Sequence, residues 1–183
     1  MGWKNVKEHY RIGHIVAVYQ SKGICIGSPY CHDLIVIKDD GSVEYGRLGE
    51  SRNDDLNRYY SEMTADKTKL VQLMQSPDKF ERSLRVYTYE GGEILEKKCE
   101  KLGWPNVTHD GEIMYDNSFS SSKSKVVTWA KNNAVAGVEI YTERIQQTRD
   151  ELIKLESKLE ETRQQLSKLE MNYPSKVKAG KDS

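Results

Sequence analysis

The chain has 183 residues and balances 28 lysines and arginines against 28 aspartates and glutamates, so its formal net charge is zero. This balance argues against the extended basic field of most nucleic-acid-binding proteins and against the acidic excess of a DNA mimic. Hydrophobic residues make up 37% of the chain, which is low for a compact globule and fits one ordinary domain with a polar appendage.

Signals for membranes or secretion are weak. No apolar stretch approaches the roughly 20 residues that span a bilayer, and the polar N-terminus lacks the core of a signal peptide. The cysteines, Cys25, Cys31 and Cys99, are odd in number and have no CxxC spacing, which predicts free thiols in a reducing compartment. We therefore expect a cytoplasmic protein with no membrane partner.

Residues 10–47 predict an antiparallel β-meander or a small barrel. The segments 14–19 and 23–28 are rich in β-branched and small residues, and Leu34–Ile37 leads into a second apolar alternation at Val43 and Tyr45. Asp40-Gly41 lies between these last two segments and supplies the positive φ that a hairpin turn needs.

Residues 53–117 predict a mixed region. Short helices are expected over 53–63, capped by Asn53 or Asp54, and over 65–75, which ends before Pro77. A strand is expected over 83–90. A glycine turn then leads into an expected helix over 92–104, which places Ile94, Leu95, Cys99 and Leu102 on one face and ends at Gly103. Residues 104–117 predict a turn-rich loop or short hairpin.

Residues 121–173 predict one long helix, with an interruption at Gly137 and a stop at Pro174. Residues 174–183 predict a disordered tail. The expected fold class is therefore α+β: residues 1–120 form a small antiparallel sheet with short helices, and a long C-terminal helix forms a coiled coil.

The long helix carries a heptad pattern. Leucine or isoleucine returns every seven residues from Ile145 to Leu166, which we take as position a, and position d alternates threonine with leucine. Val138 and Tyr141 continue the frame upstream. This spacing predicts a coiled coil. The simpler alternative is a surface helix that lies on its own domain.

Charges beside the heptads favour an antiparallel homodimer. A parallel pair would oppose like charges, such as Glu151 and Glu156, and such repulsion rejects a partner. An antiparallel pair centred between Glu160 and Glu161 instead places opposite charges together and leucine opposite leucine. The predicted interface comprises Ile145, Leu152, Leu155, Leu159, Leu166 and Leu169, flanked by Arg149, which meets Glu170, and Glu156, which meets Arg163.

Residues that could carry chemistry gather in the loop 104–117. Thr108, His109, Asp110, Asp116 and Asn117 could bind a ligand or act as acid and base. Their spacing matches no standard metal site, and Asp110-Gly111 is also simply a good turn. No metal or cofactor is therefore predicted, and the expected function is not enzymatic.

Two other motifs are weaker. Cys31 and His32 suggest a nucleophile with a base, but adjacent strand residues point to opposite faces. Eleven tyrosines are more than usual and favour contact with another protein over base stacking, because basic residues do not cluster around them.

Trp104-Pro105-Asn106, Thr108, Asp110-Gly111, and Tyr115-Asp116-Asn117 through Phe119 precede a helix that contains Ala136-Gly137 and a charged coiled coil. Over about residues 100–145 the chain thereby resembles small, uncharacterised proteins encoded by bacteriophages and prophages. The resemblance transfers no activity or site residue. It implies a phage accessory protein in the host cytoplasm that binds a host or phage protein.

We therefore expect a non-enzymatic homodimer that binds another protein, with inhibition of a host defence system, as by an anti-CRISPR protein, as one form of this function. One alternative is a nucleotide- or metal-dependent enzyme or ligand-binding protein that uses the loop 104–117. A nucleic-acid-binding regulator is the other alternative and is less favoured.

Overall fold

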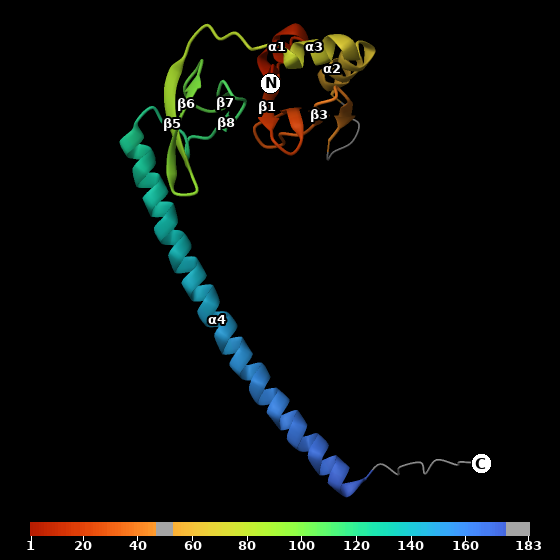
Figure 1. Ribbon diagram of the computed structural model, residues 1–183, viewed down its shortest axis with the longest axis vertical. Coiled ribbons are helices and arrows are strands. Elements are labelled where there is room, and N and C mark those ends of the chain that lie inside the picture. Colours follow the sequence, from red (N-terminus) through yellow and green to blue (C-terminus); the bar gives the residue numbers. More distant parts are fainter. Residues whose placement is uncertain (47–52, 175–183) are drawn as a thin grey trace, which may run out of the picture. The chain divides into compact units, whose positions relative to one another are not determined.

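The computed structural model describes residues 1–46 and 53–174, and the chain divides into an N-terminal unit, Met1–Lys131, and a C-terminal unit, Asn132–Ser183. The end of the predicted β-region at residue 47 and nearly all of the predicted tail, from residue 175, lie outside the described residues. The fold is α+β, with antiparallel sheets and short helices before a long C-terminal helix (Figure 1).

Four strands form the predicted meander. They are β1 (Ile15–Tyr19), β2 (Gly23–Gly27), β3 (Ile35–Ile37) and β4 (Val43–Tyr45), in the order β1-β2-β3-β4 with every pair antiparallel. Gly41 has a φ of 78° and lies in the predicted hairpin between β3 and β4. Because β1 and β4 are not paired among the described strands, this sheet is open and is not a closed barrel.

Three short helices share a core with this sheet: α1 (Trp3–His9), α2 (Asp54–Ala65) and α3 (Lys67–Gln75). The predicted N-cap of α2 is confirmed, since the Asn53 side chain accepts a hydrogen bond from the Leu56 N–H at 3.2 Å. Helix α1 was not expected from the sequence. It forms because Trp3 and Val6, one turn apart, are both buried in the core.

The expected helix over 92–104 is wrong, because the chain instead forms a β-hairpin of β5 (Leu84–Glu90) and β6 (Glu93–Cys99). Glu90 pairs with Glu93, so Gly91 and Gly92 are the whole loop, and both have positive φ. A two-residue turn of that kind matches the twist of a hairpin and requires glycine-like residues. The pair therefore joins two strands and not a strand to a helix.

The segment 104–117 contains the predicted short hairpin, β7 (Asn106–Val107) and β8 (Ile113–Met114). It adds to the β5–β6 hairpin through a bridge between Cys99 and Thr108. A second, smaller core forms where these strands meet, from Val86, Cys99, Met114 and Phe119.

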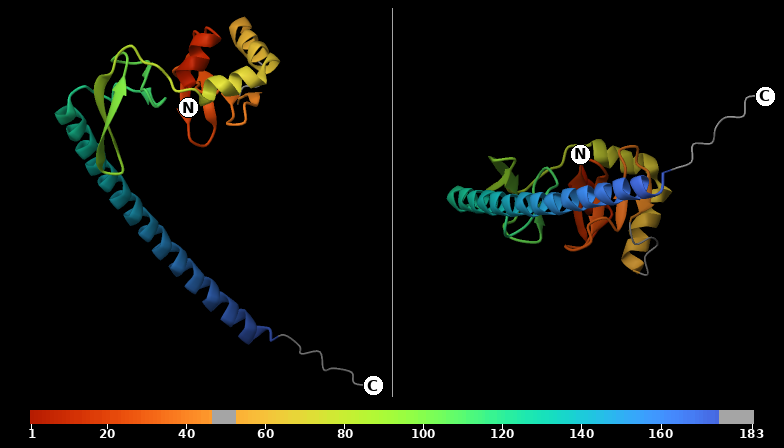
Figure 2. Two further views of the ribbon diagram at one scale, coloured as in Figure 1. Left: turned by 45° about the horizontal axis from the view of Figure 1, so that its top comes forward. Right: turned by 90° about the horizontal axis from the view of Figure 1, so that it is seen from below.

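Helix α4 (Lys123–Asn172) has 50 residues and passes through Gly137 without a break, so the expected interruption there is wrong. Figure 2 shows it as one continuous helix from two further directions. Val126 is its one buried residue, and it lies in the part of α4 that belongs to the N-terminal unit. No helix among the described residues is long and apolar enough to cross a membrane.

Candidate functional site

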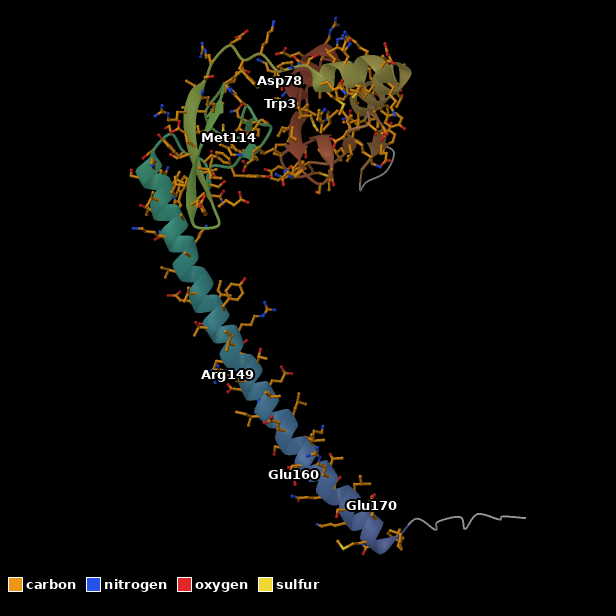
Figure 3. All side chains as sticks on the ribbon, viewed as in Figure 1. Trp3, Asp78, Met114, Arg149, Glu160 and Glu170 are labelled. Atoms are coloured by element: carbon orange, nitrogen blue, oxygen red, sulfur yellow. The ribbon has the colours of Figure 1, made fainter. Side chains whose placement is uncertain are left out.

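A long exposed apolar feature is the row of a and d residues on α4, here called the heptad face. The six predicted interface residues on it, Ile145 to Leu169, are each between 51% and 59% exposed. Val138 and Tyr141 extend the row upstream, and each is 66% exposed. Figure 3 shows the side chains of α4 along its whole length. A row of large aliphatic side chains exposed on one face is typical of a surface that pairs with another element.

The two threonines at position d also suit a buried seam. Thr148 Oγ1 donates a hydrogen bond to the Arg144 carbonyl at 2.9 Å, and Thr162 Oγ1 donates to the Lys158 carbonyl at 2.8 Å. Because each hydroxyl is satisfied within its own helix, covering these residues would not leave the hydroxyl donor without a partner. Thr148 and Thr162 could therefore be covered in a seam together with Leu155 and Leu169, the other residues at position d.

The four charged residues that flank the heptad face are exposed. Arg149, Glu156, Arg163 and Glu170 make no ion pair within the part of the chain that the structure describes. Their charges are consequently available to a second molecule. Arg149 and Glu170, labelled in Figure 3, lie three heptads apart on the same helix, about 30 Å along its axis, so they cannot reach each other within one chain.

The predicted loop site differs from the exposed heptad face, because some of its side chains are buried or bonded to neighbouring residues of the fold. Thr108 is fully buried, and its hydroxyl donates to the Asp110 carboxylate and accepts from the Glu112 N–H at 2.9 Å. Lys97 pairs with Asp110 at 2.7 Å and also with Glu112. Burial by itself would raise the pKa of Asp110, but the hydrogen bonds from Lys97 and Thr108 offset it, and the pKa lies below its ordinary value.

His109 joins three segments. Its backbone N–H donates to Lys98, its carbonyl accepts from the Trp3 indole at 3.0 Å, and its ring stacks on Phe80 with 3.7 Å between centroids. These contacts hold α1, the segment before β5, and β6 around the turn. The structure thus brings Thr108, His109 and Asp110 together in contacts that stabilise the fold.

Asp116 and Asn117 lie apart from that cluster, in the exposed turn after β8. Asp116 lines a separate small cavity of about 150 Å³ with Phe119. Among residues 1–46 and 53–174, no group of three or more His, Cys, Asp or Glu side chains is arranged to hold a metal ion.

Sequence reasoning missed an aromatic surface on the N-terminal unit, formed by Tyr19, Tyr30, His32, Trp104 and Tyr115. Tyr30 is 87% exposed and meets Trp104 edge-on at 5.9 Å between centroids. His32 stacks on Tyr19, and its Nε2 lies 3.0 Å from the Tyr115 hydroxyl. No spacing pattern could have found the surface, because its members come from two regions, residues 19–32 and 104–115, that are distant in the sequence.

Two hydroxyls of this aromatic surface, those of Tyr19 and Tyr115, stay protonated at neutral pH. Burial, and after it the nearby Tyr115, raises the pKa of Tyr19 to about 12, and burial raises the pKa of Tyr115. His32 contacts Pro29 and Tyr115, and no described contact joins it to the Cys31 thiol. The surface therefore combines apolar ring faces with polar tips, a composition suited to packing against another molecule.

Family models, curated proteins and solved structures contain no match to this chain. No residue role is therefore carried over from another protein.

Proposed function

We propose that this chain is a non-enzymatic interaction protein, which forms an antiparallel homodimer through the heptad face of α4 and binds another protein through its N-terminal unit. The observation that carries the proposal is the exposed apolar row on an unbroken 50-residue helix. An isolated helix in water gains little stability from propensity alone, and most of its stability comes from packing of an apolar face. A partner helix would supply that packing.

A second copy of this chain is the partner that the charges fit best. With the overlap centred between Glu160 and Glu161, Arg149 faces Glu170 and Glu156 faces Arg163, and the two-fold axis repeats each pair. The same register places Leu152 opposite Leu169 and Leu155 opposite Leu166. Each exposed ion pair contributes only about 0.3–0.5 kcal/mol, so the charges select the orientation while the leucines supply most of the affinity.

A second antiparallel register would also cover Val138 and Tyr141, which lie outside the first overlap. If the pair is centred between Ile153 and Lys154, Val138 faces Leu169 and Tyr141 faces Leu166. Its flanking charges are again opposite, because Arg149 then faces Glu156 and Glu151 faces Lys158. Crosslinks distinguish the two: cysteines at 152 and 169 join in the first register, and cysteines at 152 and 155 join in the second.

The aromatic surface supports a protein partner. Tyrosine and tryptophan are enriched at the centres of protein interfaces, where they bury large areas at a small cost in side-chain entropy. The exposed pair Tyr30 and Trp104 has this composition, and a homodimer would present the surface twice. Together with the resemblance to phage proteins, this supports a phage accessory protein that binds a host or phage protein, a component of a host defence system being one such target.

Sedimentation equilibrium tests the dimer. Leu155→Glu places a charge in the seam of either antiparallel register and should yield monomers at concentrations where the wild-type chain is dimeric. Ile153→Glu is the matched control, because Ile153 is 64% exposed and lies off the heptad face. A monomeric wild-type chain, or equal loss of the dimer in both variants, would refute the proposal.

Affinity capture from host lysate tests the partner. A specific partner should be lost with Tyr30→Ser and Trp104→Ser and retained with Tyr173→Ser, which removes a tyrosine of similar exposure outside the aromatic surface. Equal capture by all three variants would show that the aromatic surface is not the binding site.

A further inference from the structure

A cleft of about 400 Å³ lies in the N-terminal unit between α1, with the turn that follows it, and the segment that joins β6 to β7. Neither the heptad face nor the aromatic surface contributes to it. Six charged residues line it: Lys4, Lys7, Glu8, Arg11, Glu100 and Lys101. The cations outnumber the anions, although the whole chain has no net charge.

Both anions of the cleft are already paired with one lysine. Lys4 Nζ lies 2.7 Å from Glu100 Oε1 and 3.5 Å from Glu8 Oε1. The side chains of Lys7, Arg11 and Lys101 make no ion pair within the described parts of the chain. Three cations without an ion pair therefore share one cavity, whose four positive and two negative side chains leave an excess of two positive charges.

Lys101 lies close enough to Lys7 to disfavour the charge on Lys7. Burial, and after it the charge of Lys101, lowers the pKa of Lys7 below its ordinary value. Lys7 comes from α1, whereas Lys101 follows β6, so the fold itself brings these like charges together. An anion bound between them would offset both the repulsion and the desolvation.

Arg11 occupies a position that glycine normally takes. Its φ is 49°, the one positive value at a non-glycine residue among those described. Arg11 N–H donates to the Glu8 carbonyl at 3.2 Å and Ile12 N–H donates to the Lys7 carbonyl at 2.9 Å, which together close α1 in a Schellman motif. Arginine is strained in this left-handed conformation.

The helix dipole does not explain the whole cluster. The C-terminal end of α1 attracts a cation and accounts for a lysine or an arginine there. It does not account for Lys101, which reaches the same cleft from another segment. A ligand that needs several cations at once accounts for all three side chains.

We propose that this cleft binds a small organic molecule that carries a phosphate group. Lys7, Arg11 and Lys101 hold the phosphate oxygens, with the guanidinium able to contact two of them at once. Ile15, Pro105 and Val107 line the same cleft and provide an apolar wall for the organic part. The volume lies within the range of small-molecule sites, which are about 300–1,000 Å³.

A nucleic acid fits this feature less well. Binding a strand requires cations spaced along its phosphates, whereas these three side chains line a single cleft in a chain of zero net charge.

Isothermal titration of the full chain with inorganic pyrophosphate and with ADP, at low ionic strength, tests the site. Both probes should bind with one site per chain, and Lys101→Gln should weaken binding about tenfold or more. Lys98→Gln is the matched control, because it removes the same charge from an exposed position on β6 that does not line the cleft.

Arg11→Gly separates binding from folding. Glycine relieves the strained φ, so this variant should melt at a higher temperature than the wild-type chain while it binds pyrophosphate about tenfold more weakly. Failure of the wild-type chain to bind either probe would overturn the proposal. So would undiminished binding in Arg11→Gly and Lys101→Gln, or binding of a single-stranded oligonucleotide without binding of pyrophosphate. Binding of pyrophosphate but not of ADP would contradict the apolar wall.

Discussion

Ile24 in β2 and Leu159 in α4 are both large aliphatic residues, yet Ile24 is fully buried and Leu159 is 51% exposed. The same contrast separates the two units. Among the described residues of the N-terminal unit, every isoleucine, leucine and methionine except Met1, Leu84 and Leu102 is at least partly buried, whereas from residue 132 to 174 no described residue is buried. Since burial of apolar area is the main stabilising contribution to folding, the N-terminal unit contains a core of its own, whereas the helix beyond residue 131 contains none.

The largest expected effect comes from the core of the N-terminal unit. Ile24→Ala removes a buried side chain that faces Val18 and Ile37 across the sheet, and should lower the free energy of unfolding by about 2–5 kcal/mol. Leu159→Ala should leave the unfolding of this unit unchanged but weaken dimerisation about tenfold or more. Denaturant titration and sedimentation check the two results. Equal losses of unfolding free energy in Ile24→Ala and Leu159→Ala would show that the two units do not differ in how they are stabilised.

A second test concerns Gly111, which fixes the predicted loop site against the meander. Its φ is 94°, and a Cβ there would lie 2.3 Å from Val18 Cγ2. Gly111→Ala should therefore lower the free energy of unfolding by about 2–5 kcal/mol, because the strain of the positive φ and the steric overlap with Val18 add together. Gly91→Ala is the control, because Gly91 also has positive φ but has nothing within 4 Å of an added Cβ. Equal losses of stability in the two variants, measured by thermal unfolding, would contradict the close approach of Gly111 to Val18.

The ion pair between Lys4 and Glu100 predicts a loss of stability in acid. Burial alone would raise the pKa of Glu100, but hydrogen bonds from Lys4 and the Glu81 N–H offset it, so the pKa lies below its ordinary 4.5. A depressed folded-state pKa contributes stability above pH 4.5, and this contribution is lost as the pH falls through the folded-state value.

Glu100→Gln should accordingly cost roughly 1 kcal/mol near neutral pH and flatten the decline in stability below pH 4.5. Glu8→Gln serves as the comparison, because the Glu8 side chain is 64% exposed and lies farther from Lys4. Urea titrations at several pH values check both variants. If the stability of Glu100→Gln declined in acid as steeply as that of the wild-type chain, the pair of Lys4 and Glu100 would not contribute to the pH dependence of folding.

The smallest effect comes from the charges beside the heptad face. Arg149→Glu should weaken the dimer by a few tenths of a kcal/mol for each symmetry-related pair, and adding Glu170→Arg should restore it. Lys154→Glu makes the same change of charge at a position off the heptad face. Restoration by Glu156→Arg in place of Glu170→Arg would instead support the register centred between Ile153 and Lys154.

The sequence predicted those elements whose signals are local. Asn53 capped α2 as expected, Asp40-Gly41 lay in the β3–β4 hairpin, and α4 followed its heptads to Asn172. Residues 92–104 were misassigned because Ile94, Leu95 and Cys99 fit a helical face as well as a strand. The glycine pair before them, a hairpin signal, should have decided the choice.

The surfaces of the N-terminal unit were harder to predict, because tertiary packing assembles them. Tyr30 and Trp104 are distant in the sequence, as are Lys7 and Lys101. Thr108 and Asp110 looked like ligand-binding residues, and the structure shows them bonded to each other within a turn. The dimer interface stays a prediction, since its evidence is a pattern of exposed residues on one chain.

Disulfide trapping between two differently tagged chains tests the antiparallel dimer most directly, with Cys31→Ser in each chain because Cys25 and Cys99 are buried. Leu152→Cys on one chain and Leu169→Cys on the other should crosslink. Two chains that both carry Leu169→Cys should not, because the antiparallel arrangement separates these positions by about 25 Å along the helix axis. Efficient crosslinking of 169 to 169 would show a parallel pair and contradict the account.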